Sequence, residues 1–382
     1  MTIERKNDWS ALAIIQWLMR EGRLLGDRDR LLEGLGERML AEGAPVARIR
    51  VAMRTLHPMV RAISSTWETE VGVTPAIEAQ HGFDVSASYR GSPIEIITTT
   101  REPYRRRLDD TLGPNDPAVL HELRQDGMTD YFGRLLLFSS GPAAILTISS
   151  ATPGGFSDDD LEKINLIAGA MSPIVEVFHA YQIAEAVAEA YLGPRTGRRV
   201  LDGQITRGDI ETIEAAILIS DLRGWTRMNQ NLPPEETVAL ANRYFETVAA
   251  AVDAYDGEIL KFLGDGVLAI FPDDAARACQ QALDAAVMAQ SNADGVDFGV
   301  GMHFGRVMYG NVGSAERIDF TVLGQAVNLA ARIESLCGET GQPILYSDRF
   351  AAALDGTSRE VTRQLLKGLD DPVTIFAPQS RT

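Results

Sequence analysis

Two aspartates that each end an apolar segment are the side chains in this sequence best suited to hold a cation. Asp221 follows the apolar run Ala215–Ser220, which is the pattern of a buried strand that delivers one acid to the edge of a sheet. Asp265 lies between Gly264 and Gly266 and between two β-rich runs, which predicts a hairpin. If these strands pair beside the first, both carboxylates reach the same end of the sheet and repel unless a cation lies between them. Oxygen ligands in an open site suit Mg²⁺ or Mn²⁺, ions that usually arrive with a phosphate-bearing substrate.

A second polar set further along the chain strengthens this interpretation. Taken singly, an Asp after a strand is more often a helix cap, and Asp-Gly is ordinary turn chemistry. Gly324, however, separates a β-rich run from an Ala-rich helical run in which Asn328 and Arg332 are four residues apart. They therefore share one helical face. That face alone could equally be solvated surface, but beside two acids it points to a functional site.

Taken together, these stretches resemble the catalytic domain of the class III nucleotidyl cyclases, the adenylate and guanylate cyclase family, from about Glu211 to Ala377. The resemblance implies that Asp221 and Asp265 hold two Mg²⁺ or Mn²⁺ ions per site, with the backbone carbonyl of Leu222 completing one shell. The other residues that match the family's motifs are Lys261 and Thr321 for the purine base, Asn328 and Arg332 for the ribose and the reacting phosphate, and Lys367 for the triphosphate.

The resemblance implies conversion of ATP to 3′,5′-cyclic AMP and pyrophosphate. Lys261 can only donate hydrogen bonds, which suits the acceptor N1 of adenine and opposes the N1–H of guanine. The family's guanylate members carry an acid at that position. The hydroxyl of Thr321 can donate or accept and decides less. The alternatives are a guanylate cyclase and a catalytically silent module that binds nucleotide, although the filled site positions argue against a silent module. No side chain stands out as a general base.

The same resemblance implies a homodimer. In the family, the metal aspartates of one site and its base-reading and transition-state residues come from opposite subunits. This chain carries both sets, so a head-to-tail pair with two equivalent sites is expected.

Composition narrows the class of protein. A length of 382 residues predicts two domains, and the net charge of −17 disfavours a nucleic-acid partner. The only cysteines are Cys279 and Cys337, which argues against a disulfide framework and fits a reducing cytoplasm. The apolar piece Trp9–Met19 is too short to span a bilayer, so no membrane insertion is expected.

The predicted fold is α+β in four parts. Residues 1–42 read as two amphipathic helices, 43–173 as an α/β domain, 174–210 as a signalling helix and connector, and 211–382 as the catalytic domain. The last has the order βαββαβ plus extra strands, a ferredoxin-like layout with helices on one face of a mainly antiparallel sheet. Pro173 predicts a kink or a new first turn.

The front domain is expected to carry several strands and a sensor function. The predicted strands are Val46–Thr55, Phe83–Tyr89, Ile94–Thr99, Gly133–Ser139 and Ala143–Ser149, followed by a helix capped by Ser157. This last strand, turn and helix resemble a GAF-type sensor domain, so an unknown small-molecule or protein signal is expected to regulate the catalytic dimer through the 174–192 helix. The run Arg105–Arg107 reads as a solvated basic face, with an anion site as the alternative.

Overall fold

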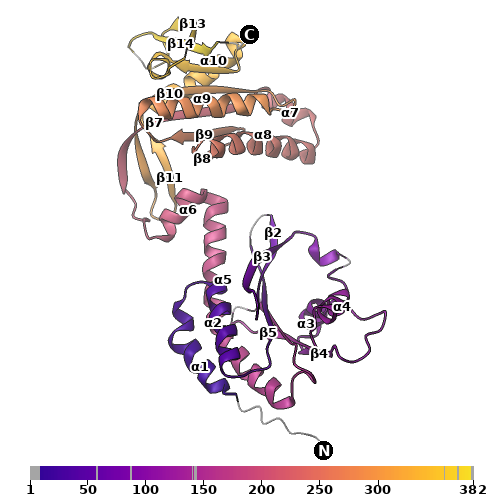
Figure 1. Cartoon of the computed structure of the whole chain (residues 1–382). Helices are drawn as coiled ribbons and strands as arrows, with labels where there is room; N and C mark the ends of the chain where they lie inside the picture. Colours follow the sequence, from indigo (N-terminus) through magenta and orange to yellow (C-terminus); the bar gives the residue numbers. More distant parts are fainter. Residues whose placement is uncertain are drawn as a thin grey trace, which may run out of the picture. The chain divides into compact units, whose positions relative to one another are not determined.

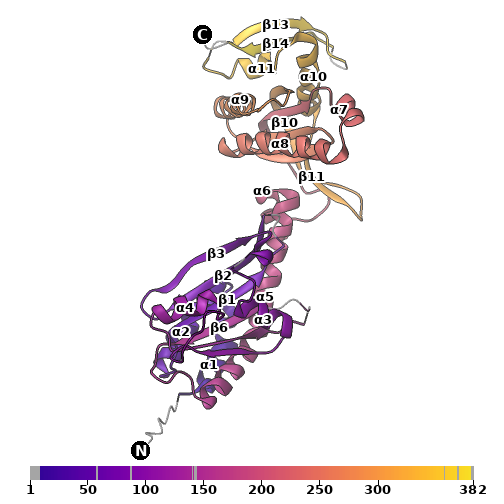
Figure 2. The same cartoon turned by 90° about the vertical axis from the view of Figure 1, so that its right-hand side faces the viewer.

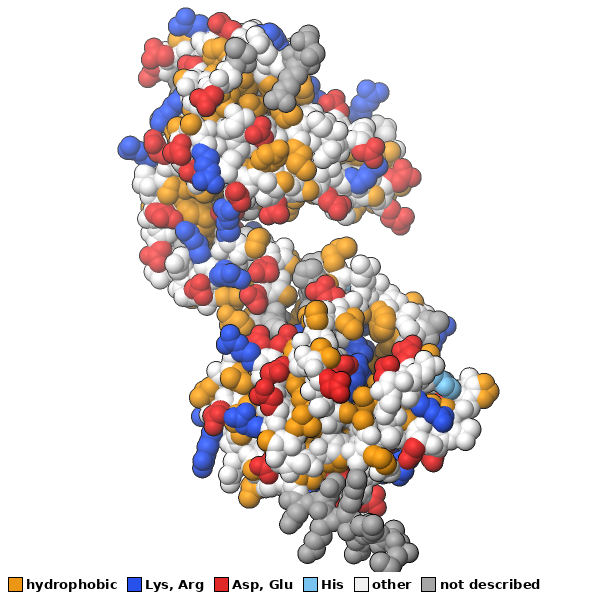
Figure 3. Space-filling view, in the orientation of Figure 1, with side chains coloured by type: hydrophobic (Ala, Val, Ile, Leu, Met, Phe, Trp, Pro, Cys, Tyr) orange, Lys and Arg blue, Asp and Glu red, His pale blue; other side chains and the backbone are white. Residues whose placement is uncertain are grey.

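The computed structural model describes residues 9–56, 59–86, 88–139, 141, 144–356, 358–367 and 370–379. The chain divides into two compact units, Met1–Ala190 and Tyr191–Thr382. On the face drawn in Figure 3, acidic and basic side chains are interspersed over each unit. No helix in the described part of the chain is long and apolar enough to cross a membrane.

Unit 1 is built on a six-stranded sheet with the order β3-β2-β1-β6-β5-β4, in which every neighbouring pair is antiparallel. Its strands are β1 (Arg48–Arg54), β2 (Val60–Glu68), β3 (Gly72–Gln80), β4 (Tyr104–Arg107), β5 (Asp130–Leu136) and β6 (Ala144–Ser150). Its helices are α1 (Ala11–Arg20), α2 (Arg28–Ala41), α3 (Pro93–Thr100), α4 (Ala118–Gln125) and α5 (Asp158–Leu192), with short 3₁₀ turns η1 (Gly22–Leu24) and η2 (Phe83–Val85).

The main core of unit 1 lies between one face of this sheet and α1, α2 and α5 (Figure 1). Alternation along β1 directs Ile49, Val51 and Met53 into this core, and so leaves Arg48 and Arg50 on the opposite face. The smaller helices α3 and α4 lie over that opposite face at its β4–β5 end, where a second, minor cluster forms around Tyr131.

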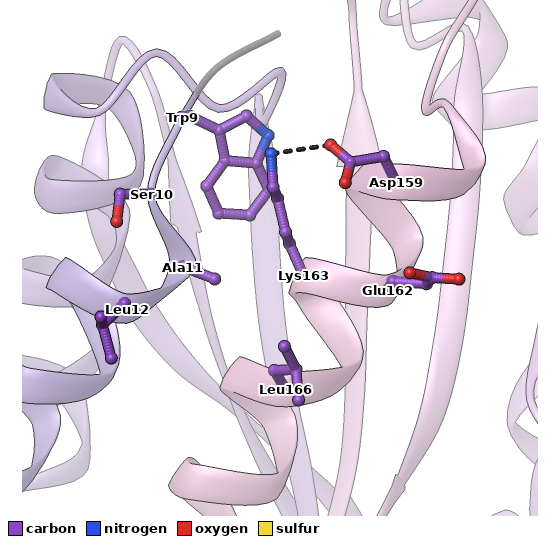
Figure 4. Close-up of a pocket in the computed structure, with 8 residues that line it drawn as sticks. All are labelled: Trp9, Ser10, Ala11, Leu12, Asp159, Glu162, Lys163 and Leu166. Atoms are coloured by element: carbon purple, nitrogen blue, oxygen red, sulfur yellow. Dashed lines mark ion pairs between the residues drawn. The ribbon is translucent and has the colours of Figure 1, made fainter.

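Trp9 fastens the start of α1 to α5 (Figure 4). Its indole nitrogen donates to Asp160 at 2.6 Å, and the ammonium of Lys163 lies 5.1 Å from its ring centre. Lys163 is itself paired with Asp159 at 2.7 Å. The shallow pocket around Trp9 is therefore a packed junction in which the charges of Lys163 and Asp159 are paired with each other.

The two helices predicted within residues 1–42 are confirmed as α1 and α2, although residues 1–8 lie outside the described part. The strand predicted from Val46 is β1. The strand predicted at Ala143–Ser149 corresponds to β6, with Ala143 itself outside the described residues, and the strand predicted from Gly133 belongs to β5, which begins three residues earlier at Asp130. The Ser157 cap is also confirmed, since its hydroxyl accepts from the backbone N–H of Asp160 at 3.1 Å.

Two predicted strands in unit 1 are wrong. Phe83–Val85 is a 3₁₀ turn, with Ala87 outside the described residues, and Pro93–Thr100 is the helix α3. Ser92 caps this helix by accepting from the backbone N–H of Glu95 at 3.2 Å. Pro93 supplies the fixed φ that suits a first helical position. These start signals outweigh the β propensity of the isoleucines and threonines that follow.

The helix α5 is continuous over 35 residues, with Pro173 in its interior, so no new helix begins there. It extends the predicted 174–192 segment toward the N-terminus as far as Asp158. The GAF-type character of unit 1 stays a prediction.

Unit 2 is built on an eight-stranded sheet with the order β13-β14-β12-β10-β7-β9-β8, and β11 pairs with β10. Its strands are β7 (Ile210–Leu222), β8 (Glu258–Leu263), β9 (Gly266–Phe271), β10 (Phe298–Gly313), β11 (Ile318–Leu323), β12 (Ile344–Ser347), β13 (Ser358–Gln364) and β14 (Val373–Pro378). Its helices are α6 (Pro194–Leu201), α7 (Trp225–Asn231), α8 (Pro234–Ala254), α9 (Ala275–Ser291), α10 (Gln325–Thr340) and α11 (Asp348–Ala351). Figure 2 shows β11 and the β13–β14 pair at opposite ends of this unit.

The predicted βαββαβ core is confirmed. The strands β10, β7, β9 and β8 lie side by side and pair antiparallel, and α8 and α9 make the two crossovers. The extra strands follow in the C-terminal part, where β12 pairs parallel with β10.

The prediction that the helices lie on one face is wrong. Ala216 and Leu218 of β7 face α8 and α9, whereas Ala215 and Ile217 face α10 on the other side. A Cβ built at Gly301 of β10 would lie 2.2 Å from a backbone nitrogen of α10. Because only glycine permits that approach, α10 packs directly on the backbone of β10 and closes the second face.

Candidate active site

The two predicted acids lie at the same end of the sheet. Asp221, near the end of β7, pairs in register with Gly266, the residue after Asp265. The backbone N–H of Leu222 donates to the carbonyl oxygen of Asp265 at 3.2 Å, which fixes the hairpin turn to the strand end. A Cβ built at Gly266 would lie 3.1 Å from the Asp221 carboxylate. Glycine at this position therefore leaves room for the acid.

The electrostatics of the pair are unfavourable in the metal-free chain. Burial, and then the negative charge of Asp265, raise the pKa of Asp221 to about 6. A carboxylate that accepted enough donors or faced a cation would have its pKa lowered instead. The pair therefore carries negative charge that this part of the chain does not compensate.

A third acid, Glu334 of α10, faces the same cluster. Burial and then Asp221 raise its pKa to about 7, against an opposing effect of Arg223. Gly299, the register partner of Asp221 on β10, makes the room, since a Cβ there would lie 2.6 Å from the Glu334 carboxylate. Glu334 is not among the residues predicted from the sequence, because it stands in a helix with no motif of its own. The alternating glycines of β10 were the available signal that a helix approaches closely.

The donor set fits a hard divalent cation. Within the described ranges, no three or more His, Cys, Asp and Glu side chains are grouped as a complete metal-ligand set. Mg²⁺ needs no such cage, because it is commonly held by one or two carboxylates with substrate phosphates and water completing six oxygens. Asp221 and Asp265 are two carboxylates that could serve in this way. The role of the Leu222 carbonyl stays a prediction.

The two predicted base-reading residues belong to adjacent elements. Lys261 of β8 forms an ion pair of 3.0 Å with Asp319 of β11. Thr321 follows two residues after Asp319 on the same strand and is 6% exposed. Since residues two apart in a strand project to one side, β11 presents Thr321 and Asp319 toward the lysine together. Asp319 is not among the residues predicted from the sequence, because its partner is 58 residues away.

Asn328 and Arg332 are on α10 but do not meet the acids of their own chain. Residues two apart on an α-helix leave its axis about 200° apart, so Arg332 and Glu334 project to opposite sides. Because Glu334 faces the Asp221 cluster, Arg332 faces away from it. Neither Asn328 nor Arg332 has a side-chain hydrogen bond or ion pair with any described residue. Their polar face is therefore unpartnered within one chain.

Lys367 is exposed in the turn after β13. No described residue pairs with its ammonium group, and residues 368 and 369, which follow it, lie outside the described part. The structure brings Asp221, Asp265 and Glu334 together and brings Lys261 to β11. It keeps the Asn328–Arg332 face separate from the acids.

A family assignment follows from this arrangement and from the sequence. Residues 210–370 match the model of the adenylate and guanylate cyclase catalytic domain. This part of the chain is a cyclase catalytic domain of that family. It contains every site residue named above, and the whole acid cluster lies inside it.

Two of the curated relatives each match a little under half of this chain. An adenylate cyclase of Anabaena cylindrica is 34% identical over 187 residues, which cover 44% of this chain and 37% of the relative. An uncharacterized protein of Mycobacterium tuberculosis (strain ATCC 25618 / H37Rv) is 36% identical over 183 residues, covering 44% and 33%. The chain thus spans about a third of the length of these relatives.

Solved structures with the same kind of domain include both nucleotide classes. The adenylyl cyclase CyaB from P. aeruginosa is 26% identical, with a TM-score of 0.40, and the match covers 45% of this chain and 98% of that one. The guanylyl cyclase Cya2 is 32% identical, with a TM-score of 0.37, and the match covers 44% and 91%. One of these two structures is named an adenylyl cyclase and the other a guanylyl cyclase.

The acid cluster predicts how the stability of the cyclase domain depends on pH. The pKa values of Asp221 and Glu334 are raised above their usual values, so between about pH 4 and pH 7 the folded chain binds more protons than the unfolded chain. Stability contributed by this cluster is therefore lost as the pH rises through that window. In metal-free buffer, Asp221→Asn should raise the melting temperature at pH 7.5 by about 2–4 °C, if about 1 kcal/mol is recovered.

The difference between the Asp221→Asn variant and the wild type should shrink at pH 5, where the native carboxyl is largely protonated. Added Mg²⁺ at pH 7.5 should raise the melting temperature of the wild type and leave that of the variant nearly unchanged. Asp253→Asn, at an exposed helical position, is the matched control and should behave alike at both pH values. If the melting temperatures of the wild type and Asp221→Asn differed by the same amount at pH 5 and at pH 7.5, the electrostatic interpretation would be contradicted.

Proposed function

We propose that the chain is an adenylate cyclase that converts ATP to 3′,5′-cyclic AMP and pyrophosphate at two sites shared between two copies. The observation that carries this proposal is the orientation of α10. Its Glu334 side faces the acid cluster of its own chain, and its Asn328–Arg332 side faces away. A complete site then needs the acids of one copy and the polar helix face of another.

Each residue has a defined task in the proposed reaction. Asp221 and Asp265 bind Mg²⁺ or Mn²⁺, two ions per site, which supply Lewis acidity to the ribose 3′ oxygen and neutralise the triphosphate. Arg332 of the other copy stabilises charge on the α-phosphoryl oxygens with its rigid donor fork. Asn328 orients the ribose, and Lys367 binds the terminal phosphates. The loss of such a phosphate-facing donor typically costs about 3–4 kcal/mol of barrier.

The base preference rests on Lys261 and its partner. The ion pair with Asp319 holds the ammonium group beside Thr321 on β11. A lysine held in this way donates to the N1 acceptor of adenine and meets the N1–H of guanine unfavourably. ATP is therefore the proposed substrate, and a guanylate cyclase is the alternative that a comparison of the two nucleotides decides.

The exposed face of α5 supports a homodimer that extends beyond the catalytic domain. Between residues 166 and 191, none of the exposed positions of this helix carries a charged side chain. They are Leu166, Gly169, Pro173, Val177, Ala180, Tyr181, Ala184, Val187, Ala190 and Tyr191. Intervals of mostly three and four residues place them on one stripe, which we call the α5 seam. A second copy is the proposed occupant, because α5 leads into a domain whose site needs one.

A mixing experiment tests shared sites. Asp265→Ala lacks an acid, Arg332→Ala lacks the phosphate-stabilising donor, and each homodimer should lose activity by a factor of roughly 10² or more. Mixed and allowed to exchange subunits, the two variants should recover up to about a quarter of wild-type activity, because random pairing makes half the dimers mixed and each has one intact site. The measurement is Mg²⁺-dependent formation of cyclic AMP.

Wild-type protein is the control, and it must form cyclic AMP from ATP. No gain on mixing, under conditions where labelled subunits are seen to exchange, would show that each copy builds its own site. A wild-type chain without activity on either ATP or GTP would favour the silent nucleotide-binding module.

The Lys261–Asp319 pair predicts a graded change in base selectivity. Asp319→Asn removes the anchoring charge while keeping the side-chain size, so kcat/KM for ATP should fall by roughly threefold to tenfold, corresponding to about 1 kcal/mol. The activity with GTP should fall less, which narrows the ATP preference. Lys261→Glu should narrow it further, because a carboxylate accepts from guanine N1–H.

Steady-state kinetics with both nucleotides measures these effects. Glu316 is an exposed acid near the same strand. The matched control Glu316→Gln should leave the ratio of kcat/KM for ATP to kcat/KM for GTP unchanged. An Asp319→Asn variant with wild-type selectivity would mean that the ion pair does not position the lysine.

The α5 seam predicts where two copies can be crosslinked. The native Cys279 and Cys337 are both fully buried. A cysteine introduced at an exposed position is therefore the thiol that can form a disulfide between copies. Ala184→Cys lies on the seam and should form a disulfide between copies under mild oxidation, because its Cα approaches its symmetry mate. Gln182→Cys, on the opposite side of the helix, should not, because disulfides require Cα atoms within about 7 Å. A non-reducing gel measures both, and equal crosslinking at the two positions would rule out the seam.

A further inference from the structure

Several arginines in unit 1 are paired with acids. The predicted basic run illustrates this, since Arg105 pairs with Asp130 at 2.8 Å, Arg106 with Asp116 at 3.0 Å and Arg107 with Asp109 at 2.8 Å. The run therefore has its charge compensated within the unit. Since each of these three guanidinium groups is paired with an acid, none is left to bind an anion at this run.

Arg50, in the middle of the sheet, is different. Its Nη2 donates to the Ser64 hydroxyl at 2.8 Å, and its Nε is buried without any hydrogen-bond partner. No carboxylate of a described residue lies within ion-pair distance of it. Burial, followed by the positive charge of Arg48, lowers the pKa of its guanidinium. Burial and the charge of Arg48 both disfavour the positively charged guanidinium, yet an arginine side chain stays charged in proteins.

The orphaned nitrogen of Arg50 is unlike the other two orphans found among the described side chains. Those are Nη1 of Arg28 and Nε of Arg223. Arg28 pairs with Asp29 at 3.2 Å and Arg223 with Asp297 at 3.5 Å. Both charges are therefore compensated by an acid of the chain, whereas the charge of Arg50 is not. An uncompensated buried charge is costly unless something outside the chain pairs with it.

The surroundings of Arg50 are rich in hydroxyl groups. Its register partners are Thr66 on β2 and Thr147 on β6, which are 3% and 6% exposed. Ser64 and Ser149 lie on the same face and are 4% and 2% exposed. This is the sheet face that does not pack on α1, α2 and α5. Hydroxyls and a guanidinium together offer donors to a ligand that brings acceptor oxygens.

We propose that this face of the unit 1 sheet binds a small anion, a carboxylate or a phosphate, with Arg50 as its charged anchor and the neighbouring Thr66 and Ser149 hydroxyls as further donors. The planar fork of arginine matches both kinds of anion in a two-point contact. The bound anion satisfies the buried Nε or an adjacent guanidinium nitrogen and removes the uncompensated charge. The proposal does not depend on the cyclase reaction.

The test uses thermal unfolding of the full chain in sodium chloride, sodium succinate and inorganic phosphate at equal ionic strength. Relative to chloride, succinate or phosphate should raise the melting temperature of the wild type by about 2–4 °C. Arg50→Met keeps the length of the side chain without its charge, and it should abolish this rise. Arg20→Met, at an exposed position of α1, is the matched control and should retain it.

The behaviour in chloride separates a ligand site from a structural role. If Arg50 serves an anion, Arg50→Met should be at least as stable as the wild type in chloride, because the variant removes a buried unpaired charge. A response to phosphate alone assigns a phosphate-bearing ligand, and a response to succinate alone assigns a carboxylate. The proposal is overturned if neither anion exceeds chloride, if Arg50→Met keeps the response, or if Arg50→Met is markedly less stable in chloride.

Discussion

The repulsion between two carboxylates held at one end of a sheet is the constraint on which the catalytic unit depends. The register of β7 with β9, the backbone bond from Leu222 to Asp265 and the bare backbone of Gly266 hold Asp221 and Asp265 together. The raised pKa of Asp221 is the electrostatic consequence. Such an arrangement costs folding free energy unless a cation offsets it, which is why it indicates binding rather than packing.

The helix α10 relates this constraint to a second copy of the chain. Its close approach to β10 requires Gly299 and Gly301, and that approach buries Glu334 beside the acids. The geometry of an α-helix then sends Arg332 to the other side. The helix α10 thus adds the negative charge of Glu334 to the acid cluster of its own chain and presents the positive charge of Arg332 on its other side. This arrangement favours a site that is shared between two copies of the chain.

Unit 1 presents the opposite electrostatic problem. There a guanidinium, that of Arg50, is surrounded by hydroxyls without an acid of its own. The arginines of β4, in contrast, each form an ion pair with an acid of the same unit. Both units therefore hold uncompensated charge at a defined place, negative in the catalytic unit and positive in the other, and in each case the proposed ligand carries the opposite charge.

Features that depend on local chemistry could be predicted from the residues alone. The strand before Asp221, the turn at Asp265, the βαββαβ order and the Asn328–Arg332 face all follow from periodicity, glycine placement and residue spacing. The wrong strand at Ile94–Thr99 also had a local cause, since the prediction followed the β propensity of these residues instead of the Ser92–Pro93 helix start signal. Contacts between groups far apart in the chain became visible only in the folded structure. Glu334 reaches Asp221, Asp319 reaches Lys261 and Arg50 lacks an acid because of strand register and helix packing, which bring together residues that no spacing along the chain connects.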